Sequence, residues 1–156
     1  MTISSSVGAP EPTLETARLR LRRLGEDDAA FILRLVNDPD WLRYIGDRGV
    51  RSLEDARRYV AAGPAAMHDR HGFSLLAVER KSEPGPIGIC GLIRRETLPD
   101  VDIGFAFLPE FRGEGYARES ASAVLAWARD VLKLPRVIAI ASVDNARSRR
   151  LLEKIG

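Results

Sequence analysis

The sequence predicts a mixed α+β fold in which a central, mostly antiparallel, twisted sheet is flanked by helices. Three apolar segments between residues 73 and 108 follow one another across short turns that contain Pro or Gly, as the strands of an antiparallel meander do. Segments with the spacing of amphipathic helices precede and follow this block. A group of strands between groups of helices predicts one sheet covered by helices.

The first half of the chain is expected to form a strand and two helices before the meander. Alternating leucines mark a strand over residues 19–24, and apolar residues with helical spacing mark a helix over 30–37. The sequence Asp-Pro-Asp at 38–40 breaks this helix. Ser52, with an acid three residues later, has the pattern of an N-cap and opens the second helix, which Gly-Pro at 63–64 ends or kinks.

The meander is expected to contain three strands. They lie at 73–78, 87–94 and 101–108, with turns predicted at 83–86 and 98–100.

The last third of the chain predicts a helix, a strand and a helix. Apolar residues follow a helical pattern over 115–132, and the wholly apolar segment 137–141 is typical of a buried strand. Asp144 or Asn145 caps the last helix, and Gly156 takes the position after its end. The predicted order is therefore β-α-α-β-β-β-α-β-α.

Length and composition point to one globular domain. We expect residues 1–13 to form a flexible leader and residues 14–156 to form a single domain, since 156 residues with 45% hydrophobic and 29% charged content are typical of such a domain. A net charge of +2, from 24 basic and 22 acidic residues, is too even to indicate a nucleic-acid partner. No apolar run approaches the roughly 20 residues of a membrane span. With no signal peptide pattern, we expect a cytoplasmic location.

Cysteine and histidine give no sign of a metal site or a covalent intermediate. Cys90 is the single cysteine and lies in an apolar run, which favours a small core residue over a nucleophile. His68 and His71 near the end of the second helix have no metal-ligand company, so we expect no metal.

The most informative segment is a glycine-containing turn at residues 112–118, between a strand and a helix. Free N–H groups and the positive end of the helix dipole make such a turn a phosphate site. The P-loop pattern is absent. The dinucleotide fingerprint is incomplete, because Arg118 stands where close packing of helix on sheet requires a small residue.

The spacing Arg112-x-x-Gly115-x-Ala117 resembles the acetyl-coenzyme A loop of the GNAT N-acetyltransferases. The order of the elements is similar to that family over residues 14–156. Within the superfamily, the segments 14–22, 102–105 and 145–156 resemble those of the ribosomal-protein N-terminal acetyltransferase branch.

The resemblance implies roles for individual residues. The turn would hold the pyrophosphate of acetyl-CoA, and the ends of the fourth and fifth family strands would part so that the pantetheine arm pairs like an added strand. Asn145 would hydrogen-bond this arm, and Ser148 would protonate the leaving thiolate. The cofactor-binding residues expected on this basis are Phe107, Leu108, Arg112, Gly113, Gly115, Tyr116, Ala117, Arg118 and Asn145.

The residues that would activate the acceptor amine are less defined. A backbone N–H near Leu108 would stabilise the oxyanion. Asp102 is the first candidate for the general base, and a solvated carboxylate on a strand face is the alternative. Glu119 would order the turn by pairing with Arg118 or Arg112, or be a solvated helix residue.

The resemblance therefore implies direct transfer of an acetyl group from acetyl-CoA to a primary amine, either a protein N-terminal α-amino group or a small molecule. A non-catalytic acyl-CoA sensor of the same fold is the alternative, and a phosphate-binding enzyme outside the family is a third. Two further C-terminal strands usual in the family are absent after Gly156, which implies either a fragment or a homodimer that shares strands.

Overall fold

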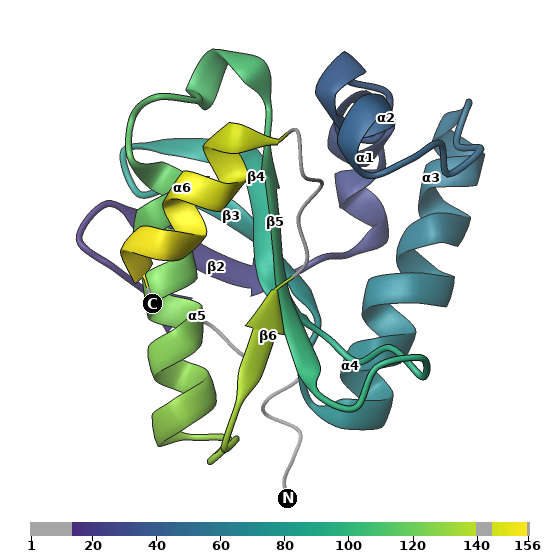
Figure 1. Cartoon of the computed structure of the whole chain (residues 1–156). Coiled ribbons are helices and arrows are strands. Elements are labelled where there is room, and N and C mark those ends of the chain that lie inside the picture. Colours follow the sequence, from purple (N-terminus) through teal and green to yellow (C-terminus); the bar gives the residue numbers. More distant parts are fainter. Residues whose placement is uncertain (1–13, 140–144, 156) are drawn as a thin grey trace, which may run out of the picture.

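The computed structural model describes residues 14–139 and 145–155, which form a six-stranded sheet with helices on both faces (Figure 1). The strands lie side by side in sequence order; the first five are antiparallel, and β6 is parallel to β5. The strands are β1 (Leu14–Glu15), β2 (Leu19–Arg23), β3 (Leu75–Arg80), β4 (Glu83–Ile93), β5 (Val101–Phe107) and β6 (Val137–Ala139). The α-helices are α1 (Ala29–Leu35), α2 (Pro39–Tyr44), α3 (Leu53–Val60), α4 (Ala66–His71), α5 (Tyr116–Asp130) and α6 (Ala146–Ile155).

The sheet is buried on both faces because its strands alternate between two cores. Leu76 and Val78 of β3 pack in the core under α5, whereas Ala77 between them packs in the core under α1 and α3. In Figure 1 the helices α1 to α4 cover one face of the sheet, and α5 and α6 cover the other. The predicted fold class is confirmed.

Two local predictions differ from the structure. The expected turn at 83–86 is wrong, because β4 begins at Glu83 and the chain reverses at residues 81–82. The pairing register of β3 with β4 shifts around Glu79, opposite Pro84 and Pro86. Proline has no N–H to donate to the ladder, and a bulge leaves residues unpaired, so the two prolines fit there. The first helix, α1, ends at Leu35, before the Asp-Pro-Asp sequence. Asp38 instead starts a further helix, α2, by accepting a hydrogen bond from Asp40 N, with Pro39 in the first turn.

Other boundaries follow from caps and breakers. Ser52 caps α3 through Asp55 N, as predicted. The Gly-Pro pair at 63–64 lies in a π-helical segment, Ala61–Ala65, which joins α3 to α4. The predicted leader, residues 140–141 of the predicted strand, the Asp144 cap and the Gly156 position lie outside the described residues. No helix in the described part of the chain is long and apolar enough to cross a membrane.

The feature that positions the site is the edge of β5 beyond its pairing with the described part of β6. The two strands pair from Val101 with Val137 to Ile103 with Ala139. Beyond Ile103, β5 continues through Phe107, and the described part of β6 pairs with none of these later residues. The far half of β5 therefore has an edge with no strand beside it among residues 14–139 and 145–155.

The close packing of β4 on its neighbours gives a stability prediction. A Cβ at Gly91 would lie 2.1 Å from Ser74 O and 2.7 Å from Leu75 Cα, and both are backbone atoms that cannot move aside alone. We expect Gly91→Ala to lower the free energy of unfolding by about 2–3 kcal/mol, as overpacking does. Urea denaturation measures this. Gly63→Ala, where no atom lies within 4 Å, is the control, and equal losses in the two variants would contradict the explanation.

Candidate active site

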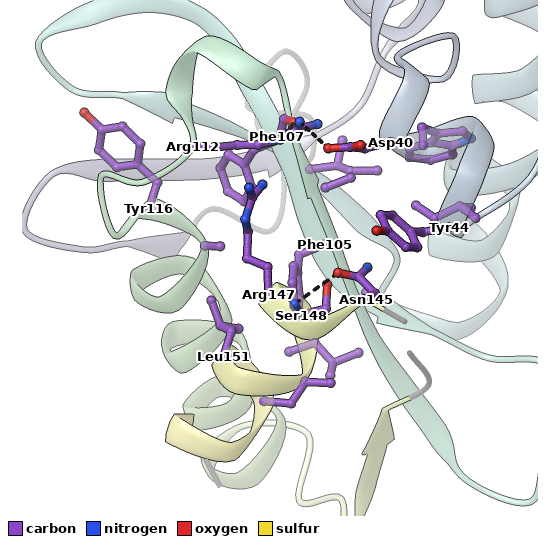
Figure 2. A pocket seen from close by; sticks show the side chains of 18 of the residues that line it. Asp40, Tyr44, Phe105, Phe107, Arg112, Tyr116, Asn145, Arg147, Ser148 and Leu151 are labelled. Carbon is purple, nitrogen blue, oxygen red and sulfur yellow. Dashed lines mark hydrogen bonds and ion pairs between the residues drawn. The ribbon is translucent and has the colours of Figure 1, made fainter. Parts of the chain in front are cut away.

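A cavity of about 1140 Å³ lies along the far half of β5. One wall comes from α2 and the residues around it, and the other comes from the turn at 112–118 and from α6 (Figure 2). The far half of β5 runs between these walls. Of the predicted site residues, all except Leu108 line this cavity, so the fold brings together segments that are far apart in sequence.

The hydrogen-bonding pattern of β5 shows which backbone groups face the cavity. Leu108 N donates to Ile87 O of β4 at 3.0 Å. Bonded pairs alternate in an antiparallel ladder, so Ala106 and Gly104 also direct their N–H and C=O toward β4. Phe105 and Phe107 therefore direct theirs to the open edge. The Leu108 N–H, which we expected at the thioester, is occupied by β4.

The turn after β5 ends in a helix N-terminus with free donors. Gly113 and Gly115 have φ values of +82° and +84°, in the left-handed region that favours glycine. Gly115 is the N-cap of α5 and has no side chain to accept the first N–H groups of the helix. The N–H groups of Tyr116, Ala117 and Arg118 thus lie in the first turn without an intrahelical acceptor, which is the arrangement that binds an anion.

Glu119, in the first turn of α5, anchors this N-terminus to the segment between β1 and β2. Its carboxylate accepts hydrogen bonds from Thr16 Oγ1, from Arg18 N at 2.9 Å and from Arg18 Nε at 2.8 Å. Burial acts to raise the pKa of Glu119, but these hydrogen bonds outweigh it and leave the pKa below its usual value. Our expected partners, Arg118 and Arg112, were wrong; the anchor comes from the segment between β1 and β2, which the sequence pattern did not place beside α5.

Arg112 joins the two walls of the cavity. Its Nε donates to Phe107 O at 3.0 Å, and its two terminal nitrogens donate to Asp38 and Asp40 at 2.8 Å each (Figure 2). Asp38 is buried and Asp40 is half exposed. The guanidinium of Arg112 therefore holds the start of α2 against the end of β5, and the expected role of Arg112 in binding the cofactor stays a prediction.

Asn145 and Ser148 lie together at the start of α6. Asn145 Oδ1 accepts a hydrogen bond from Ser148 N at 3.2 Å, so Asn145 caps this helix as predicted. Figure 2 shows both side chains beside Phe105, at the level where the open edge of β5 begins. The amide NH₂ of Asn145 and the hydroxyl of Ser148 thus supply hydrogen-bond donors at one place on the cavity wall.

Asp102 lies deeper in the same cavity and is not a solvated carboxylate. Its side chain is 3% exposed, and both of its oxygens accept from Arg95 Nε, at 3.1 and 3.3 Å. The alternative of an exposed strand residue is therefore wrong. The ion pair also means that Asp102 does not present a free carboxylate to an acceptor amine, so its assignment as the base stays a prediction.

Comparisons with known proteins agree with this geometry. The family model described as Acetyltransferase (GNAT) domain matches residues 18–156. The uncharacterized N-acetyltransferase YoaA of Bacillus subtilis is 31% identical over 148 residues, which are 93% of this chain and 82% of YoaA. The crystal structure of an acetyltransferase from Agrobacterium tumefaciens has a TM-score of 0.81 at 28% identity, and the match covers 93% of this chain and 82% of that one.

The chain belongs to the GNAT acetyltransferase family. It is an N-acetyltransferase of that family, in which the relatives YoaA and YnaD of Bacillus subtilis carry this name, and the family uses acetyl-CoA as donor. A ribosomal-protein-S5-alanine acetyltransferase from Vibrio fischeri has the same fold, with a TM-score of 0.77 at 19% identity over 94% of this chain and 82% of that one. The resemblance identified from the motifs is confirmed at the level of the family and its fold.

The GNAT site also contains basic residues that our sequence reasoning missed. Arg147, Arg150 and Lys154 line the cavity from α6, and no ion pair or hydrogen bond occupies their side chains among the residues that the structure describes. Figure 2 shows Arg147 reaching from α6 toward the end of β5. Their spacing of three and four residues places them on one helix face, and this pattern could have identified them in the sequence.

Cys90 is excluded as a nucleophile by its position. It is fully buried between β3 and β5, and burial raises the pKa of its thiol to about 12. Across residues 14–139 and 145–155, no group of three His, Cys, Asp or Glu side chains is arranged to hold a metal ion.

The two carboxylates that bind Arg112, those of Asp38 and Asp40, allow a matched test of this clamp between the start of α2 and the end of β5. Asp38→Asn keeps a good N-cap but removes the buried charge, so we expect it to lower the free energy of unfolding by about 3 kcal/mol. Asp40→Asn removes a half-exposed charge, and we expect a loss below about 1 kcal/mol. Chemical denaturation of both variants measures the difference. A larger loss for Asp40→Asn would show that the clamp does not depend on burial.

Proposed function

We propose that this protein transfers the acetyl group of acetyl-CoA directly to a primary amine in a ternary complex. The observation that carries the proposal is the convergence of three features on one cavity. These are the open edge of β5, the uncapped N-terminus of α5 and the unpaired cations of α6. A strand-like arm with a pyrophosphate at one end fits this combination.

The donor-binding residues would each use a group that is free in the structure. The N–H groups from Gly113 to Arg118 bind the pyrophosphate, and the side chains of Arg147 and Arg150 neutralise phosphate charge. Phe105 and Phe107 offer backbone groups to the pantetheine arm, as a strand does to its neighbour. Asn145 donates its amide N–H to the same arm.

The catalytic steps follow from the groups at the start of α6 and on β5. An N–H on the open edge, from Phe105 or Phe107, stabilises the negative charge that develops on the thioester oxygen when the amine attacks. Ser148 donates its hydroxyl proton to the sulfur that leaves. Asp102 would take the proton of the amine directly or through water once its pairing with Arg95 loosens.

The acceptor is proposed to be a primary amine, and a protein N-terminal α-amino group is the first class to test. The fold shared with a ribosomal-protein-S5-alanine acetyltransferase motivates that choice, but at 19% identity it supports the fold alone. A small-molecule amine and a non-catalytic acyl-CoA sensor are the other candidates. A cytoplasmic location and a homodimer stay predictions.

A single assay tests the proposed function. Acetyl-CoA is incubated with a panel of N-terminal peptides and small amines, thiol release is followed, and the acetylated product is identified by mass. We expect release that depends on both protein and amine. A rise in melting temperature with acetyl-CoA, but no thiol release with any amine, would favour the sensor.

The cations of α6 predict how the donor is bound. Arg147→Gln and Arg150→Gln should each raise the KM for acetyl-CoA about tenfold, because each removes a charge-assisted hydrogen bond to phosphate, and kcat should change little. Initial rates at varied acetyl-CoA measure this. Arg149→Gln, on the same helix but outside the cavity lining, is the control. A similar KM in all three variants would remove α6 from donor binding.

Direct transfer predicts that the thiol is dispensable. Cys90→Ala should keep kcat/KM within about twofold of the wild type at a temperature where both are folded, because a buried thiol with a pKa of about 12 cannot carry the acetyl group. Mass spectrometry of protein mixed with acetyl-CoA alone should show no acetyl-enzyme. A covalent adduct on Cys90 would overturn direct transfer.

A further inference from the structure

The acceptor end of the cavity carries two arginines and a tyrosine, and only one of these three side chains, that of Arg95, has a hydrogen-bond or ion-pair partner among the residues that the structure describes. Arg48, Tyr59 and Arg95 line this end, from the loop after α2, from α3 and from the turn after β4. Burial raises the pKa of the Tyr59 hydroxyl, and the positive charges of Arg48 and Arg95 act in the opposite direction. Both guanidinium groups are therefore close enough to act electrostatically on this hydroxyl.

Arg48 is an exposed residue of a loop that other side chains fasten, and its own charge has no partner among the described residues. The neighbouring acid, Asp47, is committed to Arg51 at 2.6 Å and to Gly49 N at 2.8 Å. Arg51 and the side chain of Asn37 in turn fasten this loop to α1. The Arg48 side chain makes no hydrogen bond or ion pair with any residue in the described ranges.

The carboxylates of the cavity do not offset this charge. Asp38 and Asp40 are bound to Arg112, and Asp102 is bound to Arg95. These are all the acids that line the cavity in the described part of the chain. Arg95 uses only its Nε for Asp102, so its terminal nitrogens remain as donors.

We propose that Arg48, the terminal nitrogens of Arg95 and the Tyr59 hydroxyl bind an anionic group of the acceptor, so that the preferred substrate is an amine that also carries a carboxylate. This inference rests on the proposed function and specifies its acceptor. A simple alkylamine brings only positive charge to this end of the cavity and leaves the three donors unpaired. A carboxylate on the same molecule pairs with them while its amine lies toward β5.

The carboxylate has two sources, the backbone or side chain of a small amino acid and the side chain of an acidic peptide N-terminus. The test therefore uses matched pairs from both. One arm compares 4-aminobutyrate with its amide, and the other compares a serine-aspartate dipeptide amide with a serine-asparagine dipeptide amide. Thiol release from acetyl-CoA and product mass are measured for each.

We expect the carboxylate member of at least one pair to have a kcat/KM about tenfold or more above its neutral partner, as a charge-assisted contact supplies. Arg48→Gln should remove that preference by raising the KM for the acceptor, with the KM for acetyl-CoA unchanged. Arg57→Gln, an exposed residue of the neighbouring helix α3 that does not line the cavity, is the matched control and should keep the preference.

A binding measurement separates this inference from the chemistry. Glutarate, a dicarboxylate without an amine, should inhibit competitively with the acceptor in the wild type and not in Arg48→Gln. Equal rates for carboxylate and amide in both pairs, or a preference that survives Arg48→Gln, would overturn the inference and leave the proposed function intact. Absence of thiol release with every amine would overturn both.

Discussion

The edge of β5 beyond Ile103, which pairs with no described residue of β6, is the constraint on which the site depends. A strand edge leaves N–H and C=O groups without partners, and proteins normally cover or pair such an edge. Here the N–H and C=O groups of Phe105 and Phe107 face a cavity. One of these groups, Phe107 O, has a partner in the protein, because Arg112 donates to it. The rest is a row of backbone groups with the spacing of a strand, which an extended ligand can fill.

Arg112 fastens the two walls of the cavity to each other, and its guanidinium is occupied by these contacts. The guanidinium does three things at once. It donates to a strand carbonyl, it is the counter-ion of buried Asp38, and it fastens the start of α2 through Asp40. Because the guanidinium contacts both walls, a shift of α2 on acceptor binding would change its hydrogen bond to the Phe107 carbonyl. The side chain of Arg112 therefore positions α2 against the end of β5, and its expected role in cofactor binding stays a prediction.

The sequence predicted most of the elements because their signals are local. The helix of α5, the cap on α3 and the cap at Asn145 each depend on residues within one turn. The errors came from contacts between distant segments. Nothing near Glu119 in sequence indicates that Thr16 and Arg18 will hold it, and the phase of the β5 ladder, which occupies Leu108 and opens Phe105, is set by β4. Local patterns identify which residues form a helix or a strand, whereas contacts between distant segments decide which segments meet and which atoms remain free.

The charged side chains of the cavity follow one pattern along its whole length, in which the acids are paired and cations remain unpaired. Every acid that lines it among the described residues is already paired with an arginine, and the unpaired cations divide into a group on α5 and α6 and a single residue, Arg48, at the other end. Unpaired charge in a concave site is stabilised when a ligand of opposite charge arrives and loses its water. The cations of α6 fit the phosphates of a CoA donor. By the same argument, the exposed Arg48 at the far end is available to pair with negative charge on the acceptor, and this supports the proposal that a carboxylate-bearing amine suits the cavity better than an alkylamine.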